Sequence, residues 1–175
     1  QAGNLVILES TSPVGTTEKI AALLAELRPD LKVPGACTGA ADIFVAYCPE
    51  RVLPGRILIE LVDNDRCIGG ITPRCARRGM SFYRQFVRGA CVTTSAPPAG
   101  KVKLVENSYR DVNIAFANEL SMMAEHMGVD VWEVIRLANR HPRVNMLQPG
   151  PGVGGHCIGV DPLFLLHGPP PHSRL

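Results

Sequence analysis

The sequence lacks long apolar runs, an excess of charge of either sign, and internal repeats. Its apolar runs are as short as Leu5–Leu8, whereas a membrane-spanning helix needs about 18 to 20 apolar residues. The 18 Lys and Arg residues nearly offset the 16 Asp and Glu residues, which leaves a formal charge of +2. This balance is too mild to indicate a nucleic-acid or anionic-membrane partner. No basic segment precedes an apolar stretch near Gln1, so no signal peptide is expected.

Cysteine pairs at metal-binding or redox spacing are also absent. The six cysteines include no CxxC pair, and no histidine stands at a zinc-ligand spacing from them: Cys37, Cys48, Cys67, Cys75, Cys91 and Cys157. A chain of 175 residues, 46% of them hydrophobic, can bury a core without disulfide bonds. We therefore expect reduced thiols, a cytoplasmic location and no bound metal.

The first half of the chain alternates between short apolar strands and helices. Strands are expected at residues 4–9, 42–48, 66–71 and 90–94, and helices from Thr17 to Pro29 and over residues 73–87. This alternation predicts a parallel α/β sheet.

The second half is helical in character. One apolar stripe at spacings of three and four residues predicts a helix of about 25 residues. The stripe indicates either core or a helix–helix interface, and its members are Val105, Tyr109, Val112, Phe116, Leu120, Met123 and Met127. Gly128 is expected to end this helix, and Asp130 to cap a second one that runs to about Asn139.

Residues 96–101 (APPAGK) stand directly before this helix. Two prolines and a glycine disfavour helix, so we expect the long helix to begin late and Lys103 to be displaced. Lys103 and Asn107 are four residues apart and share a helix face. A cation and an amide on one face can hold an oxyanion, although the same pattern also fits an ordinary solvated face.

The densest chemical signal is residues 148–162 (QPGPGVGGHCIGVDP). Its glycines formally match GxGxxG, but no strand precedes them, which argues against a dinucleotide fingerprint. The pattern instead favours a flexible loop whose backbone at Gly154 and Gly155 approaches a ligand and presents Cys157. Cys157 is then either a nucleophile or a small buried residue after a turn. Asp161 is either a general acid–base group or a helix cap.

Polar residues also follow two of the expected strands. Ser10 and Thr11 come at the end of the first strand, and Glu50 follows the strand that ends at Cys48. Ligands of α/β sheets bind at the carboxyl ends of strands, so these residues are candidates for a cofactor site. Simple turn chemistry is the alternative for Ser10 and Thr11.

Five segments, in this order and spacing, resemble the UDP-glucose/GDP-mannose dehydrogenase family. They are residues 10–17 (STSPVGTT), 47–55 (YCPERVLPG), 67–72 (CIGGIT), 103–124 (KLVENSYRDVNIAFANELSMMA) and 139–162 (NRHPRVNMLQPGPGVGGHCIGVDP). The last segment is most similar to family members that act on UDP-N-acetyl-D-mannosamine.

The resemblance implies an NAD-dependent oxidation of the sugar C6 alcohol to a carboxylate, through a cysteine thiohemiacetal and thioester. It assigns the catalytic roles to Cys157, Lys103, Asn107, Asp161, Thr11 and Glu50, and contacts with NAD to Ser10, Thr11, Glu50 and Gly154. Contacts with the UDP-sugar substrate fall to Arg143, Asn145, Gly152 and Gly155. The alternatives are a sister enzyme for UDP-glucose, UDP-N-acetylglucosamine or GDP-mannose, and a non-catalytic remnant.

The resemblance also implies the fold and the domain limits. Residues 1–96 match the C-terminal part of a Rossmann-like, NAD-binding sheet domain. Residues 97–167 match a central helical domain with a long connecting helix, the expected homodimer interface, and residues 168–175 form a frayed tail. The family's GxGxxG half and its second α/β domain are not in the sequence. We therefore expect the chain to be part of a longer protein, and inactive when isolated.

Overall fold

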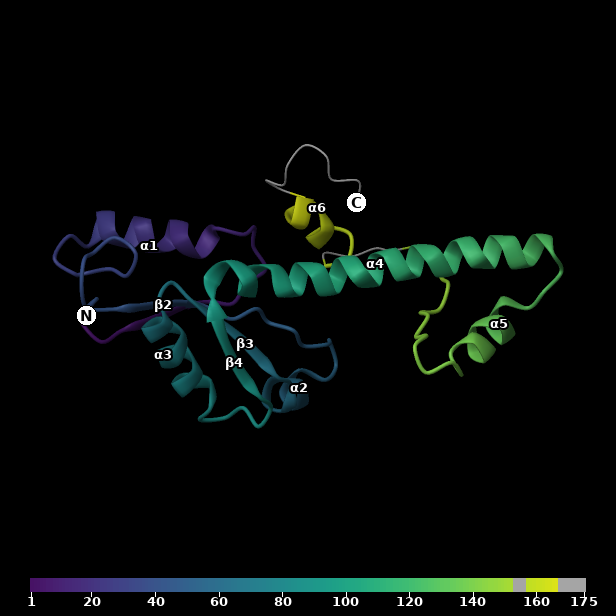
Figure 1. Cartoon of the computed structure of the whole chain (residues 1–175), viewed down its shortest axis with the longest axis horizontal. Helices are drawn as coiled ribbons and strands as arrows, with labels where there is room; N and C mark the ends of the chain where they lie inside the picture. Colours follow the sequence, from purple (N-terminus) through teal and green to yellow (C-terminus); the bar gives the residue numbers. More distant parts are fainter. Residues whose placement is uncertain (153–156, 167–175) are drawn as a thin grey trace. The chain divides into compact units, whose positions relative to one another are not determined.

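Four short strands and the helices between them make up the first part of the chain (Figure 1). The computed structural model describes residues 1–152 and 157–166. The chain divides into two units, Gln1–Leu104 and Val105–Leu175. The first unit contains the strands β1 (Leu5–Leu8), β2 (Phe44–Tyr47), β3 (Arg66–Gly70) and β4 (Cys91–Ser95) and the helices α1 (Thr16–Leu27), α2 (Ile57–Asp63) and α3 (Pro73–Tyr83).

The four strands form one sheet in the order β1-β2-β3-β4. β1 pairs parallel to β2, with Leu8 opposite Tyr47, and β3 pairs parallel to β4, with Gly70 opposite Ser95. These two pairings confirm the prediction of a parallel α/β sheet. The middle pairing differs, because β2 and β3 run antiparallel with Tyr47 opposite Gly69.

The connection between β2 and β3 explains the antiparallel pairing. Parallel neighbours need a crossover over a face of the sheet, whereas antiparallel neighbours need only a connection that returns at the same edge. The connection here holds only α2, whose apolar Ile57, Leu58 and Ile59 are exposed. Residues that follow β1 and β2 therefore lie at the edge where β3 and β4 begin.

Helices α1 and α3 cover opposite faces of the sheet, as Figure 1 shows. On one face, Ala21 of α1 packs against Val33, Ile43 and Val45. On the other, α3 contributes Tyr83 to a second cluster, which also contains Cys48, Ile68 and Val87. The sequence predicts both helices, the first from its apolar periodicity and the second from Pro73 at a permitted first-turn position.

Helix α4 (Ala96–His126) begins directly after β4, so the prediction of a late helix start is wrong. Pro97 and Pro98 fall in the first turn, where backbone N–H groups have no acceptor within the helix and proline removes no bond. Ala96 and Ala99 are buried, and Ala99 lies close to Gly69 of β3. Burial of these two alanines outweighs the cost of Gly100 in the helix, which is about 1 kcal/mol relative to alanine.

The second unit contains most of α4, followed by α5 (Val131–Ala138) and α6 (Asp161–Leu166). Gly128 ends α4 with φ of 68°, and the Asp130 side chain caps α5 by accepting from the Trp132 N–H at 2.9 Å. Both predictions are confirmed. Among the described residues, no helix combines the length and apolar character that a membrane crossing needs.

The apolar stripe of α4 is largely exposed in this chain. Only Leu120 packs against the buried cluster of Ala124, Val131 and Ile135, and six members of the stripe are exposed: Val105, Tyr109, Val112, Phe116, Met123 and Met127. For these six the core alternative is wrong, and the alternative of a helix–helix interface stands.

Candidate active site

Cys157 begins a turn that leads into α6. Its side chain is exposed, and its carbonyl oxygen accepts from the N–H groups of Val160 at 3.2 Å and Asp161 at 2.9 Å. Asp161 is the first residue of α6 and is only 3% exposed. The cysteine is therefore an accessible thiol on a turn whose last residue is a buried carboxylate, and the alternative of a buried cysteine is wrong.

The Asp161 carboxylate is tied to α4. The Asn107 side-chain amide donates to Asp161 Oδ2 at 2.5 Å, across 54 residues of sequence. Asn107 uses one of its two amide hydrogens in this bond, which leaves the second for another acceptor. Lys103 lies one turn earlier on the same helix. The structure thus brings Asn107, Asp161 and the Cys157 turn together.

The loop between α5 and the glycine-rich segment carries the candidate substrate residues. The Asn139 side chain bonds to Met146 twice, donating to its carbonyl at 3.0 Å and accepting from its N–H at 2.7 Å. Arg143 and Asn145 are exposed on the loop that these bonds close. The Arg143 N–H donates to Nδ1 of the His141 ring at 3.3 Å.

The glycine-rich segment is held by α4. The Gly150 N–H donates to Asn118 Oδ1 at 2.8 Å, and Gly152 has φ of 109°, where L side chains are disfavoured. Gly154 and Gly155, the two other candidates in this segment, lie outside the described residues.

The candidate cofactor residues Ser10, Thr11 and Glu50 follow β1 and β2 at one edge of the sheet. Ser10 is exposed, Thr11 is half-buried, and the Glu50 N–H donates to the Glu9 carbonyl at 3.3 Å. Both carboxylate oxygens of Glu50 are engaged: Oε1 accepts from the Arg51 N–H at 2.8 Å, and Oε2 from Arg66 Nη1 at 3.2 Å. The orientation of the Glu50 carboxylate is therefore fixed by the chain itself.

A buried polar network supports this edge. Arg66 is 2% exposed, donates to the Leu61 carbonyl at 3.0 Å and lies over the Tyr83 ring at 5.7 Å. The Tyr83 hydroxyl donates to Glu9 Oε1 at 2.5 Å. Burial raises the pKa of the Cys48 thiol to about 11, and burial together with the Glu9 hydrogen bond raises the pKa of Tyr83. The network therefore holds Cys48 and Tyr83 as neutral groups beside a paired arginine.

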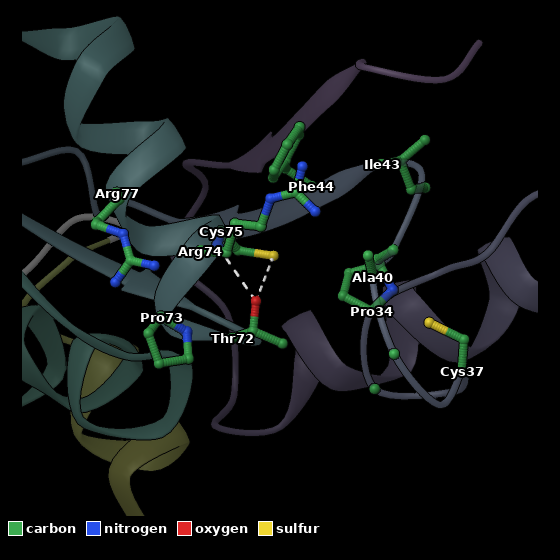
Figure 2. Close-up of a pocket in the computed structure, with 13 residues that line it drawn as sticks. Pro34, Cys37, Ala40, Ile43, Phe44, Thr72, Pro73, Arg74, Cys75 and Arg77 are labelled. Carbon is green, nitrogen blue, oxygen red and sulfur yellow. Dashed lines mark hydrogen bonds between the residues drawn. The ribbon is translucent and has the colours of Figure 1, made fainter.

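A separate cavity of about 320 Å³ opens at the N-terminus of α3 (Figure 2). Figure 2 shows Thr72 capping the helix, where its hydroxyl accepts from the Cys75 N–H at 3.3 Å and donates to Cys75 Sγ at 3.2 Å. Arg74 lies over the Phe44 ring at 5.0 Å on the same rim. None of the predicted site residues that the structure describes lines this cavity. Within residues 1–152 and 157–166, no three His, Cys, Asp or Glu side chains gather as a metal site requires.

Two residues of this arrangement were missed by sequence reasoning. Arg66 is a charged residue at the start of an otherwise apolar strand, a position that requires a partner once the strand is buried. Asn118 stands eleven residues after Asn107, a spacing of three helical turns that places both on one face of α4. Both signals are present in the sequence.

Models of the two family domains match most of the chain. The NAD binding domain of the UDP-glucose/GDP-mannose dehydrogenase family matches residues 1–87, and the central domain of that family matches residues 98–170.

Individual relatives match over nearly the whole chain. The UDP-N-acetyl-D-mannosamine dehydrogenase of Yersinia pestis is 62% identical over 173 residues, 99% of this chain and 41% of that protein. The NDP-N-acetyl-D-galactosaminuronic acid dehydrogenase of Ralstonia solanacearum is 61% identical with the same coverage. The solved UDP-D-ManNAc dehydrogenase of Pyrococcus horikoshii is 50% identical with a TM-score of 0.88, over 95% of this chain and 38% of that one. The chain spans about two fifths of the length of these relatives.

Proposed function

Because the chain belongs to the UDP-glucose/GDP-mannose dehydrogenase family, we propose that it supplies the thiol segment and part of the NAD-binding domain of a nucleotide-sugar 6-dehydrogenase. The observation that carries this proposal is the exposed Cys157 on a turn tied through buried Asp161 to Asn107. An accessible thiol, and a carboxylate four residues after it that is bonded to an amide donor, are groups that aldehyde oxidation through a thioester requires.

The proposed reaction oxidises a sugar alcohol by four electrons. One C6 alcohol, two NAD⁺ and one water give one carboxylate, two NADH and three protons. NAD⁺ supplies the hydride acceptor for both oxidations when it is bound. The remaining chemistry falls to the side chains of this chain.

Cys157 acts on the aldehyde that the first oxidation forms. Its thiolate adds to the carbonyl carbon, which creates a C–S bond and an oxygen anion on the former carbonyl. The free N–H of the Asn107 amide and the Lys103 ammonium stabilise that anion. The second oxidation leaves a thioester on Cys157. Asp161 orients the water that attacks this thioester, breaks the C–S bond and returns the thiolate.

The edge formed by β1 and β2 fits the nicotinamide end of the cofactor. The hydroxyls of Ser10 and Thr11 can bond to a carboxamide, and the Glu50 carboxylate is held at the same edge of the sheet by Arg51 and Arg66. The family match of residues 1–87 to an NAD binding domain supports this placement.

The favoured substrate is UDP-N-acetyl-D-mannosamine, supported by the 62% identical Yersinia relative and the Pyrococcus structure. The Ralstonia relative, at 61% identity, supports an N-acetylated galactose-type sugar as the second candidate. Both sugars carry an acetamido group, which separates them from UDP-glucose and GDP-mannose.

A homodimer through α4 is part of the proposal. The exposed apolar stripe of Val105, Tyr109, Val112 and Phe116 runs along one face of this helix. A face of this kind is covered in stable assemblies, and a second copy of the same helix is the simplest complement. Sedimentation of the chain with Val112→Glu as the disrupting variant tests this part.

A chimera tests the catalytic proposal. This chain replaces the matching 173 residues of the Yersinia relative, and NADH is measured with NAD⁺ and each nucleotide sugar. We expect two NADH per UDP-N-acetyl-D-mannosamine, and a rate at least about 10³-fold lower for Cys157→Ser. Cys37→Ser is the matched control, because Cys37 is a free, partly exposed thiol that is not among the site residues.

Thiol labelling of the chain itself separates the enzyme from a non-catalytic remnant. Near neutral pH, iodoacetamide should label Cys157 first and leave Cys48 unlabelled in the folded chain. An active chimera whose rate is unchanged by Cys157→Ser contradicts the thioester route. If the chimera is inactive and iodoacetamide labels Cys157 no faster than the other cysteines, the alternative of a non-catalytic remnant is favoured.

A further inference from the structure

Two asparagines on one face of α4 hold the chain on either side of Cys157 in the sequence. Asn107 donates to Asp161, four residues after the cysteine, and Asn118 accepts from the Gly150 N–H, seven residues before it. Eleven residues make three helical turns, so the two side chains point the same way about 16 Å apart along the helix. One face of α4 therefore holds the chain at Gly150, before Cys157, and at Asp161, after it.

The Asn118 bond is a tertiary contact and not a local one. Asn113, five residues earlier on α4, donates to the carbonyl of Tyr109 at 2.7 Å and so bonds within its own helix. Asn118 instead reaches across 32 residues to a backbone N–H that stands between Pro149 and Pro151. Because prolines have no N–H, the Gly150 N–H is the only backbone donor of that three-residue stretch. Asn118 holds it.

The same bond holds the chain directly after the loop that carries the candidate substrate residues. Asn139 fixes the loop at Met146, and Asn118 fixes it at Gly150. Arg143 and Asn145 precede the first of these points, and Gly152 follows the second. A loop held in one conformation before binding loses less entropy when a ligand arrives.

We propose that Asn118 is a positioning residue for nucleotide-sugar binding, an inference that rests on the function proposed above. It acts through the backbone of Gly150 and touches no reacting atom. Its loss frees the chain at Gly150, between the loop and Gly152, but leaves the Cys157 turn tied to Asn107 through Asp161. Substrate affinity should therefore fall while the chemical step is spared.

The magnitude follows from one hydrogen bond. A single intramolecular hydrogen bond contributes a factor of about 2 to 10 to an equilibrium. In the chimera with the Yersinia relative, Asn118→Leu, which is close in size but has no acceptor, should raise KM for the nucleotide sugar about 2- to 10-fold. The kcat should change by less than about twofold. Asn118→Asp keeps an acceptor for the Gly150 N–H and should restore the original KM.

Asn113→Leu is the matched control on the same helix. It removes a hydrogen bond of similar length that serves only α4, so KM should stay unchanged. A direct readout comes from the 175-residue chain without any substrate. Asn118→Leu should accelerate hydrogen exchange at the Gly150 amide, whereas Asn118→Asp and Asn113→Leu should not.

The outcomes separate the two proposals. Equal KM values for Asn118→Leu and Asn118→Asp, in a chimera that Cys157→Ser inactivates, overturn the role of Asn118 and leave the proposed function intact. An equal rise in KM for Asn113→Leu also overturns it, because the effect then reflects the helix. If Asn118→Leu accelerates exchange at the Gly150 amide but the chimera has no dehydrogenase activity, the hydrogen bond from Gly150 to Asn118 is confirmed as a restraint on the chain. The proposed function is then refuted.

Discussion

Replacing Arg66 with methionine tests how strongly the buried ion pair next to Glu50 stabilises the sheet. Arg66 is 2% exposed and donates to Glu50 Oε2 at 3.2 Å and to the Leu61 carbonyl at 3.0 Å. Methionine fills part of the same volume but donates no hydrogen bond. Removing one member of a buried ion pair costs about 3–5 kcal/mol. Because the Glu50 side chain is 31% exposed to water, we expect the lower limit, about 3 kcal/mol.

Hydrogen exchange of the β2 and β3 amides is the suitable assay. The single tryptophan, Trp132, lies in the second unit, so its fluorescence does not report on the sheet. A loss of about 3 kcal/mol corresponds to exchange about 10²-fold faster for amides that open with the sheet.

Arg88→Met is the matched control for this prediction. Arg88 pairs with Asp63 at 3.8 Å, but its side chain is 82% exposed, and exposed pairs contribute less than about 1 kcal/mol. Exchange rates in Arg66→Met that match those of Arg88→Met would refute the reasoning. Adding Glu50→Gln to Arg66→Met should recover part of the loss, because the carboxylate that lost its partner is then neutral.

Two further predictions concern glycines and pH. Gly69→Ala should destabilise the sheet by about 1–3 kcal/mol, because its Cβ would lie 2.5 Å from Ala99 Cβ and 2.7 Å from the Ser95 carbonyl oxygen. Gly100→Ala, whose Cβ meets only Val14 at 3.8 Å, should stabilise α4 by about 0.5–1 kcal/mol, and urea unfolding of both variants compares them. The chain should also lose stability as pH rises from about 9 to about 11, since unfolding releases Cys48 to ionise at its ordinary pKa of 9.0 instead of about 11. Burial of Tyr83 acts in the same direction, and a Cys48→Ala variant with an unchanged slope of stability against pH would contradict the assignment to the thiol.

The sequence predicts the elements of the first unit well because each has a single periodicity and clear breakers. Helix α1 ends at Leu27, directly before Arg28 and Pro29, and Pro73 opens α3 as expected. Helix α2 was missed, because the apolar residues Ile57 to Ile59 are consecutive and form no stripe. The early start of α4 was also missed, because local propensity disfavours it and only burial of Ala96 and Ala99 supports it.

The sequence also predicts only part of the candidate site. Helix spacing predicts that Lys103 and Asn107 share a face, but the bond from Asn107 to Asp161 joins residues 54 apart, and no local pattern specifies it. The catalytic roles of Lys103, Asn107 and Asp161 follow from the resemblance to the dehydrogenase family and not from residue spacing. Asn118 carries a usable signal, its spacing from Asn107, but asparagines on helices are common, and only the contact with Gly150 separates it from Asn113.

The antiparallel step between β2 and β3 places Arg66 beside Glu50. In a wholly parallel sheet the first residue of β3 would lie at the amino edge, far from residues that follow β2. Here β3 begins at the edge where β1 and β2 end, so its first side chain meets the carboxylate that follows β2. The strand order thus brings a buried cation to the edge that carries Ser10 and Thr11. A reversed β2–β3 pairing would leave Glu50 without this partner, however closely the local sequence were kept.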